Sequence, residues 1–290
     1  MTISRRRFLQ VGAAATVSAA LSPRQLTAHA LKTGVKFKIG VTDWNLKQTA
    51  RIESIALAKK IGFDAVQVSI GRQMQLKDEL LQKAFLDESK RLGFPIASLC
   101  LDILHVNGLK SDPLGAQWVA ESIPIAKRMG VKVILLPFFG KWALQTQAEM
   151  DYTGDALREL APAAEKAGVI LGLEDTISAR DNVRIMDRAK SPAVLTYYDV
   201  GNSTQHGFNI IEEIRWLTAR RICEVHLKDN PHFMGQGKID FPAVVDALAE
   251  IGFDKWAQLE CVAPTGSVEN DMGANLKFIR GVIARRGEKG

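Results

Sequence analysis

The sequence predicts a (β/α)8 TIM barrel, and three observations support this fold class. One unit recurs along the chain: an amphipathic helical stretch, a glycine and then an apolar run of about six residues, the length of a buried parallel strand. Eight strand-like runs fit into about 260 residues, the usual size of this barrel. The segment TDWNLKQT after the first run lacks the glycine-rich phosphate turn expected of the competing doubly wound open sheet.

The predicted elements follow one another in chain order. The first strand is FKIGVTDW (37–44), and five glycine-marked units follow it: KKIGFDAVQVSI, KRLGFPIASLCLDI, KRMGVKVILLPFF, EKAGVILGLED and AEIGFDKWAQLEC. Their glycines lie where a helix needs a left-handed residue to end: Gly62, Gly93, Gly130, Gly168 and Gly252. The long interval before the last unit holds two further strands, LTYYDVGN (195–202) and ICEVHLKDN (222–230), separated by a helical stretch at 209–220.

The first thirty residues resemble a twin-arginine signal peptide. SRRRFL (4–9) precedes an uncharged stretch at 11–21, and AHA (28–30) offers an A-x-A cleavage site. The uncharged stretch is too short for a stable membrane span. We therefore expect a signal peptide at 1–30 and a barrel domain at 31–290. The twin-arginine export machinery would then deliver the protein to the periplasm or the extracellular space.

Charge and cysteine content exclude other classes of protein. The formal net charge is +6, but residues 1–30 carry four arginines and no other charge, which leaves 6 − 4 = +2 for the remainder. A nearly neutral domain gives little support for a nucleic-acid partner. The three cysteines, Cys100, Cys223 and Cys261, lie inside strand-like runs. An odd number at such positions argues against a disulfide framework.

Four consecutive predicted strands end in a carboxylate or an imidazole: Glu174, Asp199, His226 and Glu260. Each residue alone would more often be a solvated strand end, a helix N-cap or a core histidine. In a barrel, however, the carboxyl ends of neighbouring strands converge about 4.8 Å apart. Three carboxylates that close would raise one another's pKa unless a cation were bound. The set predicts one divalent metal ion, of which Mn²⁺, Mg²⁺, Co²⁺ or Zn²⁺ suits the ligands better than Ca²⁺ or copper.

Further motifs accompany these four residues, namely D-x-G-N at 199–202 and HLKD…GxGxxDF between residues 226 and 241. Together they resemble the xylose isomerase-like TIM-barrel superfamily of sugar phosphate isomerases and epimerases, over essentially all of residues 35–285. The AP endonuclease branch of that superfamily expects additional histidines, where this chain has Asn202 and the segment DFP (240–242). A nuclease is therefore not expected.

The resemblance implies a metal site and a reaction. Glu174, Asp199, His226 and Glu260 match the metal ligands, and Glu174 and Glu260 match the acid/base pair of the epimerases. One carboxylate would remove a proton α to a carbonyl of a carbohydrate substrate, giving an enediolate, and the other would return the proton. Because phosphorylated sugars are chiefly cytosolic, export favours free sugars or glycosides as substrates.

Two other functions stay open. Relatives in the superfamily eliminate the aglycone from 3-keto-glycosides, so an exported 3-keto-glycoside lyase or hydratase would use the same metal site. A non-catalytic sugar-binding barrel is the alternative of another class, although binding alone would not require both glutamates. The sequence does not decide between a monomer and a homo-oligomer.

Six residues are candidates for substrate contacts: Trp44, His105, Arg180, Asn202, Lys228 and His232. Lys228 shares the inward strand face with His226 and could contact a substrate oxygen or pair with Glu224. Trp44 could stack on a sugar ring or fill the core, and His105 could be a loop residue or part of a pocket wall. Arg180 and His232 replace the glutamate and arginine that ketose epimerases tend to carry there, and Arg180 could equally be a surface helix residue.

Overall fold

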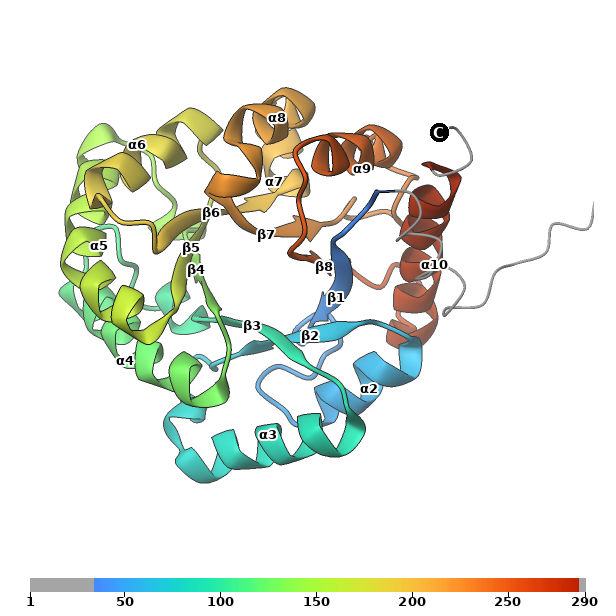
Figure 1. The fold of residues 1–290 in the computed structure, drawn as a ribbon, viewed down its shortest axis with the longest axis horizontal. Helices are drawn as coiled ribbons and strands as arrows, with labels where there is room; N and C mark the ends of the chain where they lie inside the picture. Colours follow the sequence, from blue (N-terminus) through green and yellow to red (C-terminus); the bar gives the residue numbers. More distant parts are fainter. Residues whose placement is uncertain (1–33, 287–290) are drawn as a thin grey trace, which may run out of the picture.

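The computed structural model describes residues 34–286, which form one closed barrel of eight parallel strands. Figure 1 looks down the barrel and shows the strands in chain order around its axis. The strands are β1 (Lys38–Thr42), β2 (Ala65–Ser69), β3 (Ile96–Cys100), β4 (Val133–Pro137), β5 (Ile170–Glu174), β6 (Val194–Asp199), β7 (Ile222–Leu227) and β8 (Trp256–Leu259). Parallel pairing of β1 with β8 closes the barrel, so the predicted fold class is confirmed.

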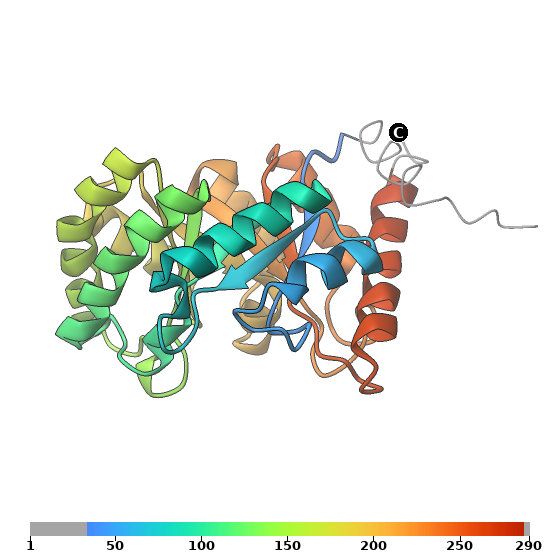
Figure 2. The ribbon, with the colours of Figure 1, turned by 90° about the horizontal axis from the view of Figure 1, so that it is seen from below.

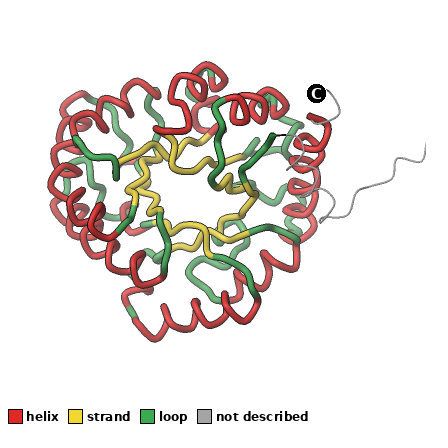
Figure 3. Tube along the Cα trace, viewed as in Figure 1, coloured by secondary structure: helices red, strands yellow, loops and turns green. Residues whose placement is uncertain are grey.

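Helices form a continuous outer ring around the strands, as the tube in Figure 3 shows. They are α2 (Glu53–Ile61), α3 (Glu79–Leu92), α4 (Pro113–Met129), α5 (Gln147–Ala167), α6 (Ala179–Ala189), α7 (Val200–Gln205), α8 (Ile210–Arg221), α9 (Phe241–Glu250) and α10 (Val268–Arg286). Three short 3-10 turns, η1 (Gln75–Lys77), η2 (Asp102–His105) and η3 (Gly140–Trp142), follow β2, β3 and β4. The extra helix α7 follows β6 directly and precedes the crossover helix α8.

The predicted glycine caps are present at the ends of the helices. Gly62, Gly93, Gly130 and Gly168 are the left-handed C-caps of α2, α3, α4 and α5. Gly252 also has a positive φ of 70° and lies just past α9. A residue with a Cβ is strained in this conformation, whereas glycine is not. The sequence pattern therefore located these helix ends correctly.

The core has two layers. The larger layer lies between the strands and the helices, where side chains such as Val66, Leu173 and Val225 are fully buried. A smaller apolar cluster inside the barrel contains Tyr197 and Cys223. The cysteines of the chain are all buried and unpaired, in keeping with the absence of a disulfide framework.

The loops that follow the strands gather at one end of the barrel, the lower end in Figure 2. The first described residues lie at the opposite, upper end. Because all eight strands are parallel, their carboxyl ends and the residues after them meet at this lower end. No helix within residues 34–286 is long and apolar enough to cross a membrane. The predicted signal peptide at 1–30 lies outside the described residues.

Asp43, in the turn after β1, is a fully buried carboxyl group that gives the fold a testable pH dependence. Burial raises its pKa to about 7, although the backbone N–H groups of Ser69 and Ala50 and the Ser69 hydroxyl all donate to it. Because the pKa of Asp43 is higher in the folded than in the unfolded protein, the contribution of its protonated carboxyl group to the free energy of unfolding is complete below pH ~4. This contribution is lost as the pH rises through about 7.

We therefore expect Asp43→Asn to gain stability relative to the wild type as the pH rises from 4.5 to 8, by on the order of 3 kcal/mol. Asparagine can keep the contacts, since its carbonyl oxygen accepts both backbone N–H groups and its amide donates to the Ser69 hydroxyl. Urea unfolding of both proteins at the two pH values measures the difference. A difference that does not change with pH would mean that Asp43 is buried as a carboxylate.

Candidate active site

The four predicted ligands converge at the carboxyl end of the barrel. Glu174 and Asp199 are the last residues of β5 and β6, His226 lies near the end of β7, and Glu260 follows β8 directly. Asp199 pairs with His226 in the sheet register, and the Glu260 backbone N–H donates to the carbonyl of Leu227. One donor atom from each of the four side chains lies within 4.8 Å of the other three.

The imidazole of His226 is the centre of this group. Its Nδ1 atom lies 2.7 Å from Glu174 Oε1, 3.4 Å from Glu260 Oε2 and 3.7 Å from Asp199 Oδ2. His226, Glu174 and Asp199 are buried, and Glu260 is partly exposed. Three carboxylates therefore surround one ring nitrogen in a site that is largely screened from solvent.

Asp199 combines two roles that the sequence left as alternatives. Its Oδ1 atom accepts the backbone N–H groups of Gly201 and Asn202 and so caps α7. Its Oδ2 atom faces His226 and Lys228. The cap fixes the carboxylate, because two hydrogen bonds hold one oxygen while the other points into the site.

The orientation of His226 depends on Gln67 of β2, a residue that the sequence did not single out. His226 Nε2 lies 2.8 Å from Gln67 Oε1, and both side chains are fully buried. A carbonyl oxygen can only accept, so Nε2 carries the hydrogen that it donates to Gln67. The lone pair of the neutral ring is then on Nδ1, directed at the three carboxylates, as a metal-ligating histidine requires.

The donor set fits a divalent metal ion. Three carboxylate oxygens and one imidazole nitrogen suit Mn²⁺, Mg²⁺, Co²⁺ or Zn²⁺, and the hydrogen bond to Gln67 supplies the outer support that such a histidine normally has. Without a cation, Glu174 and His226 hold protons more tightly than usual. Burial, with the Glu260 and Asp199 charges, raises the pKa of Glu174 to about 8. Burial disfavours a charged His226, but Glu174 and Glu260 outweigh it and raise the pKa of the ring to about 10.

Replacing Gln67 by leucine should weaken divalent-metal binding about 10- to 100-fold, because His226 loses the acceptor that fixes its tautomer. Titration calorimetry with Mn²⁺ and Zn²⁺ measures the affinity. Gln117→Leu, on the exposed face of α4, is the matched control and should leave it unchanged. Equal affinities in both variants would show that Gln67 does not position the ring.

Lys228 lies within the same group. Its Nζ atom is 2.6 Å from Asp199 Oδ2 and 2.5 Å from Glu260 Oε2. Burial would lower the pKa of this ammonium, but the Asp199 and Glu260 carboxylates outweigh it and raise the pKa above its ordinary value. Burial likewise opposes ionisation of Asp199, but Lys228 and His226 lower the pKa of that carboxyl below its usual range.

The predicted alternative of a Lys228–Glu224 pair is wrong. Glu224 accepts hydrogen bonds from Ser98, Tyr197 and Gln258 inside the barrel. Lys228 lies one residue beyond the end of β7, so the two-residue alternation that would align it with Glu224 no longer applies. The lysine turns instead towards the carboxylates at the tips of β6 and β8.

A cavity of about 290 Å³ opens beside the four residues. Its lining consists of Trp44, Thr49, Ser69, Arg72, Cys100, Asp102, His105, Pro137, Phe139, Glu174 and Glu260. The Trp44 indole N–H donates to Glu260 Oε1 over 3.0 Å, and the His105 ring stacks on Phe139 with 6.1 Å between centroids. Trp44 and His105 are therefore wall residues of the cavity, which was one of the two alternatives for His105, whereas stacking of Trp44 on a sugar ring stays a prediction. Arg72 and Asp102 were not predicted.

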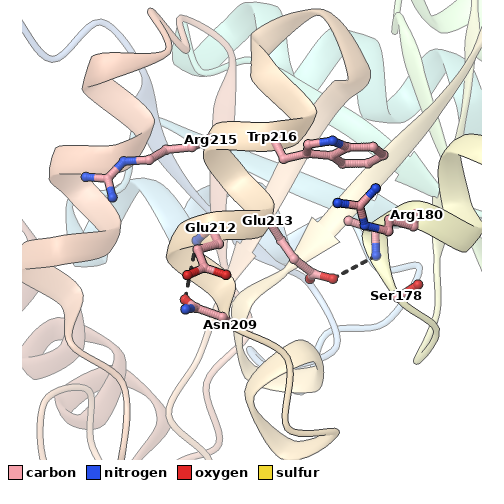
Figure 4. A pocket seen from close by; sticks show the side chains of 8 residues that line it. Ser178, Arg180, Asn209, Glu212, Glu213, Arg215 and Trp216 are labelled. Carbon is pink, nitrogen blue, oxygen red and sulfur yellow. Dashed lines mark hydrogen bonds between the residues drawn. The ribbon is translucent and has the colours of Figure 1, made fainter.

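Three candidate substrate contacts lie elsewhere. The backbone N–H of Asn202 donates to the N-cap Asp199, but the Asn202 side chain does not line the cavity. His232 lines a separate pocket of about 300 Å³ with Thr204 and Lys238. Arg180 stacks on Trp216 in a third pocket, of about 630 Å³, between α6 and α8 (Figure 4).

The position of Arg180 has a local cause. Ser178 caps α6, and Glu213 of α8 accepts the N–H of Ala179, so the chain has already turned outward when it reaches residue 180. The guanidinium consequently faces α8, as Figure 4 shows. The structure thus does not bring residues 180, 202 and 232 to the cavity that contains Glu174 and Glu260.

The fold and the site together define a class: a TIM barrel with a carboxylate–histidine group at the carboxyl ends of its last four strands. Within that class, the chain belongs to the xylose isomerase-like TIM barrel family, which matches residues 55–282.

The chain is similar to known epimerases in sequence and fold. The 2-epi-5-epi-valiolone 7-phosphate 2-epimerase of Actinoplanes sp. is 27% identical over 210 residues, 67% of this chain and 73% of the relative. The crystal structure of D-psicose 3-epimerase with D-tagatose from Clostridium cellulolyticum H10 superposes with a TM-score of 0.74 at 17% identity, covering 85% of this chain and 99% of that one. The IolI protein with a binding zinc atom gives a TM-score of 0.68 at 20% identity, covering 86% and 99%.

Proposed function

We propose that the protein is a divalent-metal-dependent isomerase or epimerase acting on a sugar or sugar derivative. One observation carries this proposal: Glu174 and Glu260 approach His226 Nδ1 from two different strands and line one cavity. Epimerisation through an enediolate needs two such carboxylates flanking one substrate. The Actinoplanes and Clostridium proteins are both epimerases, which supports the same reaction class for this chain.

The residues of the chain account for the proton transfers. One of the two glutamates removes the proton α to the carbonyl, and the other returns a proton to the opposite face or to the neighbouring carbon. Trp44 and Lys228 hold the two oxygens of Glu260, and Glu174 Oε1 lies 2.7 Å from His226 Nδ1, so both carboxylates are held in fixed positions. A divalent ion bound by Glu174, Asp199, His226 and Glu260 would stabilise the negative charge that develops on the substrate oxygens.

Incubation of the metal-supplemented protein in D₂O with a panel of ketoses and 3-keto-glycosides tests the proposal. We expect deuterium to enter at one carbon while the carbon skeleton is retained, because the abstracted proton exchanges with solvent. Release of an aglycone would establish the 3-keto-glycoside lyase or hydratase instead. Binding of sugars without any exchange or release would leave the non-catalytic sugar-binding barrel.

We further propose export by the twin-arginine pathway, on the strength of the SRRRFL segment at 4–9. The protein would then act in the periplasm or outside the cell. Replacing Arg5 and Arg6 together by lysine should retain the protein in the cytoplasmic fraction. Immunoblots of fractionated cells measure the distribution, and equal distribution of the variant and the wild type would remove the export proposal.

A further inference from the structure

A second polar surface lines the cavity of Glu174 and Glu260. It consists of Arg72, after β2, and of Asp102 and His105, in η2 after β3. We call these three residues the distal wall. None of them belongs to the four-residue group, so they are available for a part of the substrate that does not react.

The distal wall carries both signs of charge. Asp102 is buried, and its Oδ1 atom accepts the backbone N–H of Gly71 over 2.8 Å. The guanidinium of Arg72 makes no hydrogen bond or ion pair with any residue between 34 and 286, but its charge acts on Asp102 and His105. Burial and Arg72 lower the pKa of His105, so this imidazole is neutral at neutral pH. One cation and one carboxyl group therefore remain.

We propose that the distal wall binds an uncharged, hydroxyl-bearing part of the substrate, so that the enzyme acts on an unphosphorylated sugar. This inference rests on the proposed function and narrows its substrate class. A sugar hydroxyl can donate to the Asp102 carboxylate and accept from Arg72, and the neutral imidazole of His105 can do either. The volume of about 290 Å³ suits a small substrate.

A phosphate group fits this wall poorly. Phosphate recognition favours clustered cations, whereas here Arg72 shares the wall with Asp102. The Asp102 carboxylate repels a phosphate group placed beside Arg72. The ammonium of Lys228, next to Glu260, already pairs with Asp199 and Glu260. The wall thus discriminates against anions by a repulsive element as well as by its hydrogen bonds.

Equilibrium binding separates this inference from the proposed reaction, because it needs no turnover. Calorimetry in the presence of Mn²⁺ compares D-fructose with D-fructose 6-phosphate, and D-ribulose with D-ribulose 5-phosphate. We expect the wild type to bind the uncharged member of each pair at least about tenfold more tightly. Tighter binding of the esters, or binding of neither member, would overturn the distal wall as a neutral-sugar subsite. The D₂O exchange test of the reaction stands apart from either result.

Two variants locate the selectivity. Asp102→Asn should strengthen binding of the phosphate esters about tenfold, because asparagine keeps an acceptor for Gly71 but carries no charge. Arg72→Met should weaken binding of both members of a pair, whereas a wall built for anions would lose only the esters. Asp87→Asn, which removes the same charge from an exposed pair on α3, should leave the ratio of the affinities for the free sugar and its phosphate ester unchanged. An unaltered ratio in Asp102→Asn would contradict the proposal.

Discussion

Replacing Glu260 by glutamine is expected to reduce turnover at least about 10³-fold, because the amide cannot exchange a proton with the substrate. The change is nearly isosteric. The glutamine carbonyl oxygen can still accept the Trp44 indole N–H that now reaches Glu260 Oε1 over 3.0 Å, whereas Lys228 loses Glu260 Oε2 and keeps Asp199 as its partner. We expect metal and substrate to bind still, but more weakly, since one anionic donor becomes neutral. The rate at which deuterium from D₂O enters the substrate, measured at saturating metal, gives the turnover.

A matched control is available on the outer ring. Glu269→Gln makes the same chemical change in α10, where Glu269 pairs with Lys60 in an exposed position, and it should not alter the rate. Unchanged turnover in Glu260→Gln would remove the acid/base assignment. If the turnover of Glu260→Gln recovers fully at high metal concentration, Glu260 serves only as a metal ligand. The experiment therefore includes a titration with metal.

The fold and the four-residue group could be predicted because their signals are local. Each strand is an apolar run that ends next to a loop, and four of the preceding helices, α2 to α5, end at a glycine with a positive φ, such as Gly168. A parallel barrel brings all strand ends to one rim, so residues as distant as Glu174 and Glu260 must become neighbours once the fold is known. Their meeting follows from topology and needs no side-chain detail.

The surroundings of the group could not be predicted in the same way. Gln67 reaches His226 across the barrel interior over a sequence separation of 159 residues, and several other polar side chains point inward, among them Ser98 and Gln258. Strand periodicity assigns a side chain to a face but does not choose its partner. Beyond the strand ends, strand periodicity does not predict where a side chain points, so the partners of Lys228 could not be predicted.

Replacing Lys228 by methionine is expected to destabilise the metal-free protein by about 3–5 kcal/mol, the usual cost of removing one partner from a buried ion pair. The ammonium lies between Asp199 and Glu260, at 2.6 and 2.5 Å, whereas His226 Nδ1 faces the same two carboxylates at 3.7 and 3.4 Å. Methionine keeps the aliphatic stem, which packs beside Gly201. The loss therefore reports the missing charge, and urea unfolding with a chelator present measures it.

The same experiment with saturating Mn²⁺ separates charge from packing. A divalent ion in the group would neutralise Asp199 and Glu260 without the lysine, so the difference between Lys228→Met and the wild type should shrink when metal is bound. Lys83→Met, which breaks the exposed pair with Asp87 on α3, should cost no more than about 1 kcal/mol with or without metal. If the Lys228→Met deficit stays the same when metal is added, the lysine stabilises the barrel through packing and is not an internal counter-ion of the carboxylates.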